Sequence, residues 1–96
     1  MQRDFALQLL AQSKPVLAQR FGVRDLALFG SMSQNLAGAL SDVDVLVGFD
    51  GPATSARFFG VQFYLEDVLG RPVDLVTDKA LRPELRPFVE NQAIHV

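Results

Sequence analysis

Three aspartates and a Gly-Ser pair are the residues of this 96-residue chain whose types and spacing could carry chemistry. Asp42 and Asp44 are separated by one valine, so on an extended strand their carboxylates share a face, about 7 Å apart along the backbone. Asp74 lies in a second short apolar segment, and Gly30-Ser31 ends an apolar run ten residues before Asp42. The pattern therefore predicts a site made of carboxylates and a glycine-containing turn.

Carboxylates gathered in this way repel one another, by about 3 kcal/mol for a pair within about 5 Å at an effective dielectric constant near 20. A divalent cation offsets that repulsion, and hard oxygen ligands favour Mg²⁺. Two such ions about 3.5–4 Å apart can activate an attacking hydroxyl and neutralise a departing pyrophosphate. At Gly30-Ser31 the outward backbone N–H groups and the missing β-carbon favour a nearby phosphate. These residues indicate a metal–triphosphate site for nucleotidyl transfer.

A strand over residues 42–49 would position the first two acids. Its valines and aspartates alternate, so they point to opposite faces of a sheet. The pattern predicts a helix over 55–69 and a second strand over 73–76. Strand, helix and strand form a crossover unit, so the two strands should be parallel and adjacent. The crossover would bring Asp74 beside the other two acids.

The remaining segments predict further helices and strands around this unit. We expect helices over 3–12, from Ser13 to Phe21 and over 82–92, a strand over 26–29, one helical turn within 32–41 and an edge strand over 93–96. The fold class is α/β, with a small mixed β-sheet of three to four strands flanked by helices. Because the chain has no linker, repeat or charge block, we expect one domain over residues 1–96.

Composition excludes several other classes of protein. With 49% hydrophobic and 21% charged residues the chain can build a core, so it is not a disordered segment. A formal net charge of −2 argues against direct nucleic-acid binding, which normally needs a basic surface. The absence of cysteine excludes a disulfide scaffold, and the single histidine excludes a histidine-based zinc cluster. We expect no membrane span and no signal peptide, with the cytoplasm as the default location.

The run Leu28-Phe29-Gly30-Ser31, ten further residues and Asp42-Val43-Asp44 resembles the Gly-Ser-x10-Asp-x-Asp signature of the polymerase-beta-type nucleotidyltransferases. More narrowly, the chain resembles the minimal nucleotidyltransferase (MNT) antitoxins, which accompany HEPN toxins. The likeness covers nearly the whole chain and includes residues 21–23, 69–77 and 80–83.

This resemblance implies a nucleotidyltransferase fold and a Mg²⁺-dependent transfer of AMP from ATP to a tyrosine of a HEPN ribonuclease toxin encoded nearby. Asp42 and Asp44 would hold metal, and Asp74 would ligate metal or accept the proton of the acceptor hydroxyl. Gly30 and Ser31 would bind the triphosphate. The chain would then be a protein adenylyltransferase that acts as an antitoxin, as an oligomer or in a hetero-oligomer with the toxin.

One segment departs from the family pattern. Family members often continue Gly-Ser-x-Ala-Arg-Gly, whereas this chain has Gln34-Asn35 in place of Arg-Gly. The missing cation leaves open a catalytically weak binding module that neutralises the toxin by occlusion. Lys79, Arg82 or Arg86 could supply the charge instead. A third alternative is a nucleotide-transferring subunit that acts on a small molecule held by a second, helical subunit.

Three aromatic residues outside this site leave a choice between packing and binding. Phe59, Phe63 and Tyr64 extend beyond the main apolar stripe of the helix over 55–69. They predict either additional core beside the sheet or a patch that docks a partner. His95 is expected to be a surface residue rather than a catalytic one.

Overall fold

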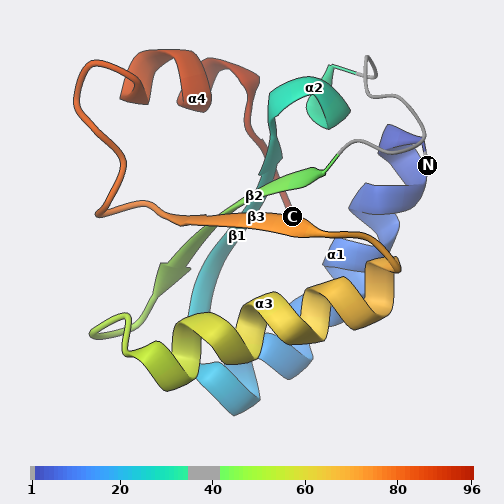
Figure 1. The fold of residues 1–96 in the computed structure, drawn as a ribbon, viewed down its shortest axis with the longest axis vertical. Helices are drawn as coiled ribbons and strands as arrows, with labels where there is room; N and C mark the ends of the chain where they lie inside the picture. The colour runs from blue at the N-terminus through green and yellow to red at the C-terminus, as the bar shows by residue number, and fades with distance from the viewer. Residues whose placement is uncertain (1, 35–41) are drawn as a thin grey trace.

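A four-stranded mixed sheet organises the fold (Figure 1). The computed structural model describes residues 2–34 and 42–96. The strands lie in the order β3-β2-β1-β4, with these bounds: β1 Val23–Phe29, β2 Val43–Phe49, β3 Val73–Thr77 and β4 Ile94–His95. β2 and β3 are parallel, whereas β1 pairs antiparallel with both β2 and β4. The predicted α/β class and the small mixed sheet are confirmed.

The crossover unit has the predicted topology. Helix α3, Ser55–Leu69, connects β2 to the adjacent parallel strand β3. The Thr54 hydroxyl accepts a hydrogen bond from the backbone N–H of Arg57, and Gly70 ends the helix in the left-handed conformation. β3 pairs with β2 in a register that sets Val43 opposite Val73 and Asp44 opposite Asp74.

Helix α1 is one helix, Arg3–Phe21, and the predicted break near Ser13 and Pro15 was wrong. Pro15 removes one backbone hydrogen bond inside the helix. The Ser13 side chain is buried, and its hydroxyl donates to the Leu9 carbonyl oxygen at 2.8 Å instead of capping a new helix. Leu10 and Leu17 are fully buried on either side of Pro15, so packing of one continuous face outweighs the lost bond.

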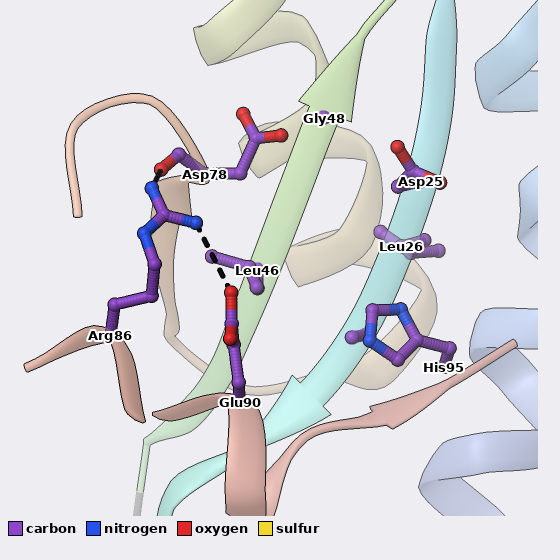
Figure 2. Close-up of a pocket in the computed structure, with 9 residues that line it drawn as sticks. Asp25, Leu26, Leu46, Gly48, Asp78, Arg86, Glu90 and His95 are labelled. Atoms are coloured by element: carbon purple, nitrogen blue, oxygen red, sulfur yellow. Dashed lines mark hydrogen bonds and ion pairs between the residues drawn. The ribbon is translucent and has the colours of Figure 1, made fainter. Parts of the chain in front are cut away.

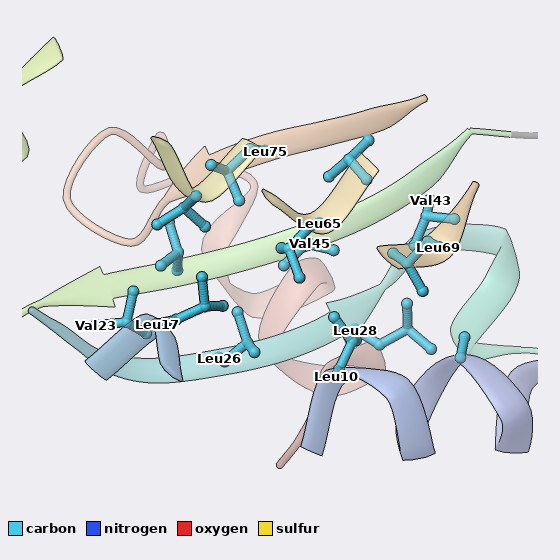
Figure 3. Close-up of a cluster of buried hydrophobic side chains, with 14 of the residues drawn as sticks. Leu10, Leu17, Val23, Leu26, Leu28, Val43, Val45, Leu65, Leu69 and Leu75 are labelled. Atoms are coloured by element: carbon cyan, nitrogen blue, oxygen red, sulfur yellow. The ribbon is translucent and has the colours of Figure 1, made fainter. Parts of the chain in front are cut away.

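The hydrophobic core lies between one face of the sheet and helices α1 and α3 (Figure 3). The valines of β2 alternate toward these helices and are fully buried. Leu10, Leu28 and Leu65 meet them from α1, β1 and α3 and are likewise fully buried. Alternation therefore turns Asp44, the aspartate of β2, to the opposite face, as the sequence predicts.

Two short helices belong to that opposite side of the sheet, where Figure 1 shows α2 and α4 above the strands. Helix α2 is a single turn, Gly30–Ser33. The prediction of one helical turn within 32–41 falls mostly on residues 35–41, which lie outside the described residues. Helix α4 spans only Arg86–Gln92, because Pro87 occupies its first turn and turns fill the preceding residues. The predicted edge strand is present as β4, in which His95 pairs with Ala27. No helix in the described part of the chain is long and apolar enough to cross a membrane.

Candidate functional site

Asp44 and Asp74 are direct neighbours across the parallel strands β2 and β3. Burial, first of all, and then the nearby carboxylates of Asp74 and Asp42 raise the pKa of the Asp44 carboxyl above its usual value. A side-chain hydrogen bond with Asp74 acts in the same direction. Asp42 is exposed and directly precedes β2. The structure therefore places Asp44 and Asp74 side by side, with the Asp42 carboxylate close enough to act on Asp44.

Gly30 lies against the Asp44 carboxylate at the end of β1, where Phe29 pairs with Asp44. A β-carbon at Gly30 would collide with that carboxylate, and the backbone has a positive φ of 74°. Glycine is thus required twice, for the left-handed backbone and for the space that Asp44 occupies. Ser31 follows it in the single turn of α2. The sequence indicates this glycine because a phosphate can approach its backbone closely. The structure shows in addition that Gly30 lies against the Asp44 carboxylate.

The oxygen donors of this site suit a hard divalent cation. In the described ranges, no three acidic or imidazole side chains already stand together as a metal-binding group. A bound cation would offset the repulsion between the neighbouring Asp44 and Asp74 carboxylates. The donor types and the placement of the acids therefore fit Mg²⁺, with Asp42, Asp44 and Asp74 as the residues that could hold it.

One of the basic residues that could replace the missing arginine, Arg86, is engaged away from the three acids. Arg86 donates to the Asp78 carbonyl oxygen at 2.8 Å and to Oε1 of Glu90 at 3.2 Å, beyond the far end of β3 (Figure 2). Lys79 and Arg82 are exposed in the turns that follow β3. Gln34 is exposed after α2, and Asn35 lies outside the described residues. Arg86 is therefore occupied elsewhere in the structure.

A cavity of about 350 Å³ opens on the same side of the sheet as the three acids, between the strands and α4 (Figure 2). Asp25, Gly48 and Asp78 line one end of it, and the exposed His95 lines another part. Sequence reasoning missed this cavity because its walls come from segments that lie far apart in the chain. An isolated glycine inside a strand, Gly48, was the one signal that could have indicated it.

The aromatic residues of α3 divide between packing and exposure. Tyr64 packs against the core and lies under the Arg20 guanidinium. Phe59 and Phe63 stack with ring centroids 6.1 Å apart and are 49% and 64% exposed. Additional core is therefore confirmed for Tyr64 only, and a docking patch at Phe59 and Phe63 stays a prediction.

Acids paired across parallel strands, beside a glycine that ends the neighbouring strand, are the arrangement that the sequence predicts for nucleotidyl transfer. The family model of the nucleotidyltransferase domain matches residues 10–96, and the chain belongs to this family. It is 36% identical over 88 residues to protein adenylyltransferase MntA of Thermococcus cleftensis, covering 92% of this chain and 89% of the relative. A Methanocaldococcus jannaschii relative, provisionally assigned as a protein adenylyltransferase, is 35% identical over 89 residues. The match covers 92% of this chain and 91% of the relative. The chain is therefore a nucleotidyltransferase, similar to relatives that are named as protein adenylyltransferases.

Solved structures share this fold. One provisionally assigned as a minimal nucleotidyltransferase has a TM-score of 0.82 and 32% identity, covering 98% of this chain and 95% of its own. Two more distant structures show the fold alone. An MNT antitoxin complex with a tri-AMPylated HEPN toxin from Shewanella oneidensis has a TM-score of 0.60 and 22% identity, covering 97% of this chain and 66% of its own. A toxin–antitoxin structure with AMP-PNP has a TM-score of 0.72 and 23% identity, covering 88% and 69%.

Proposed function

We propose that this chain is the antitoxin of a HEPN/MNT pair and transfers AMP from ATP to a tyrosine of its HEPN toxin. The observation that carries the proposal is the contact of Asp44 with Asp74 on one side and with Gly30 on the other. This arrangement offers a metal-binding pair next to a backbone turn suited to phosphate. The protein adenylyltransferase relatives and the AMPylated toxin complex support the choice of nucleotide and acceptor.

In the proposed reaction the three acids divide between cation binding and proton transfer. Asp42 and Asp44 hold Mg²⁺, which neutralises charge on the phosphates when bound. The backbone N–H groups of Gly30-Ser31 hold the β- and γ-phosphates. The tyrosine oxygen forms a bond to the α-phosphorus, the bond from that phosphorus to the pyrophosphate oxygen breaks, and pyrophosphate leaves. Asp74 accepts the hydroxyl proton.

The position of Asp74 supports a protein as the acceptor. Asp74 is exposed, and it lies on β3, an edge strand of the sheet. A hydroxyl on the surface of another folded protein can reach an exposed acid at a sheet edge without entering a closed pocket. We therefore place the acceptor tyrosine on the β3 side of the site.

The test is a label-transfer assay with ATP labelled at the α-phosphate, Mg²⁺ and the product of the neighbouring gene. We expect label on the partner, at tyrosine, and a loss of transfer in the double variant Asp42→Asn with Asp44→Asn. Asp67→Asn is the matched control, because Asp67 is exposed on α3 and should keep full transfer. No transfer by the wild-type chain, or full transfer by the double variant, would overturn the proposal.

Neutralisation by occlusion is a second candidate, favoured by the exposed Gln34, which stands where the family often has an arginine beside the phosphate site. In that case the chain forms a tight complex with the toxin and inhibits its ribonuclease activity without labelling it. The double aspartate variant separates the two candidates, because occlusion predicts full inhibition by that variant whereas AMP transfer predicts none.

A further inference from the structure

The cavity between the sheet and α4 lies next to the three acids, because it opens on the same face of the same strands. Leu46 and Gly48 line it and follow Asp44 at alternate positions along β2. Ala27 pairs with Leu46 across β1 and also lines it. Residues two apart on a strand lie about 7 Å apart, so the cavity begins within one nucleoside length of the Asp44 carboxylate.

At the far end of the cavity, the carboxylates of Asp25 and Asp78 lie beside Gly48, which has no side chain. An alanine β-carbon at Gly48 would lie 3.0 Å from Oδ2 of Asp25 and 3.1 Å from Oδ2 of Asp78. Figure 2 shows these two side chains on either side of Gly48, on β1 and just after β3. Ionised carboxylates only accept hydrogen bonds, so a ligand here must present donors.

The only guanidinium in the cavity lining is already engaged. Arg86 donates to Glu90 and to the Asp78 carbonyl oxygen, so its charge is balanced within the wall. A phosphate would therefore meet the carboxylates of Asp25 and Asp78, with no lysine and no unengaged arginine among the described residues that line the cavity. A neutral ligand with hydroxyl or amine donors, resting on Ala27 and Leu46, suits this lining better. The volume of about 350 Å³ lies within the range of small-molecule sites.

We propose that this cavity binds the nucleoside half of the nucleotide and that Asp25 and Asp78 accept hydrogen bonds from its donor groups. The inference rests on the proposed function. In-line displacement puts the attacking hydroxyl and the leaving pyrophosphate on opposite sides of the α-phosphorus. With pyrophosphate toward Gly30 and the acceptor toward Asp74, the direction left for the nucleoside runs along β2 toward Leu46.

The first test measures KM for ATP and for the acceptor protein separately. We expect Asp25→Asn and Asp78→Asn each to raise KM for ATP about tenfold or more, with KM for the acceptor unchanged. Gly48→Ala should give a similar rise, because its methyl group fills the space between the carboxylates. Gly51→Ala is the matched control, since the nearest atom to its β-carbon lies 3.4 Å away and outside the cavity. Thermal unfolding of each variant verifies that it is folded.

Nucleotide analogues identify which donor groups of the nucleoside form hydrogen bonds with Asp25 and Asp78. Loss of the 2′-hydroxyl in dATP or of the exocyclic amine in ITP should raise KM for the wild-type chain. This rise in KM should be smaller in the variant that lacks the carboxylate to which the missing group would donate its hydrogen bond. A rise in KM for the acceptor with KM for ATP unchanged would overturn the proposal and assign the cavity to the acceptor. Unchanged KM values in all three variants would also overturn it.

Adenosine alone provides a test that needs no transfer. In amide chemical-shift experiments, adenosine should perturb Ala27, Gly48 and Asp78 in the wild-type chain and not in Gly48→Ala. If the chain transfers no AMP but binds adenosine there, the proposed function fails while the cavity assignment survives. If it transfers AMP but adenosine perturbs no residue of the cavity, only the cavity assignment fails.

Discussion

The two faces of the sheet have opposite physical roles, although the same strand supplies both. On the face toward α1 and α3, the valines of β2 are fully buried in a close-packed core. On the other face, Asp44 is held next to two more carboxylates, with its pKa raised by burial and by those neighbours. The first face stabilises the fold, and the second holds charges that favour a bound cation. The alternation of residues in one strand therefore links stability to function.

The packed face should give the largest change in stability. Leu65→Ala removes a fully buried side chain of α3, and we expect it to lower the free energy of unfolding by about 2–5 kcal/mol. Val68→Ala, on the exposed side of the same helix, should change it by about 0.5 kcal/mol or less. Chemical denaturation measures both. Similar losses for the two variants would mean that the core does not lie where the structure puts it.

The glycine next to Asp44 should be sensitive in two ways. Gly30→Ala meets a positive φ, which costs about 1–2 kcal/mol, and its β-carbon collides with the Asp44 carboxylate. Gly70→Ala is the matched control, because φ is 67° there and no atom lies within 4 Å of the added carbon. We expect both variants to lose stability but only Gly30→Ala to lose AMP transfer. Equal transfer by both would show that the Asp44 carboxylate tolerates displacement.

A substitution on the acidic face should give the smallest change in the free energy of unfolding, and it should raise that free energy rather than lower it. Because the folded state raises the pKa of Asp44 above 3.8, folding takes up protons, and this contribution to stability falls as pH rises through the folded pKa. Without metal, Asp44→Asn should therefore be more stable than the wild type at pH 7. The difference should shrink as the pH falls through the raised pKa of Asp44, because the Asp44 carboxyl then becomes protonated in the folded wild type. Denaturation at several pH values, with Asp67→Asn as control, would contradict this if Asp44→Asn were the less stable protein at pH 7.

The sequence was sufficient to predict the parts of the fold that depend on local pattern. Alternation in residues 42–49 and the crossover to β3 predicted which acids meet, and β3 pairs with β2 in the register that brings Asp74 to Asp44. The course of α1 through Pro15 was not predictable, because packing of distant segments decides it. The cavity was hidden for the same reason, since Asp25, Gly48 and Asp78 meet only in the folded sheet.

The most direct test of the central claim is the joint stabilisation of the chain by Mg²⁺ and ATP. Thermal unfolding should be measured with each alone and with both, for the wild type and for Asp44→Asn. We predict that the pair, at about 100 times its dissociation constant, adds about 2.7 kcal/mol to the free energy of unfolding of the wild type. Either component alone should add little, and Asp44→Asn should lose the joint effect. An equal joint effect in Asp44→Asn, or the whole effect from Mg²⁺ alone, would contradict a site in which the acids, the cation and the nucleotide bind together.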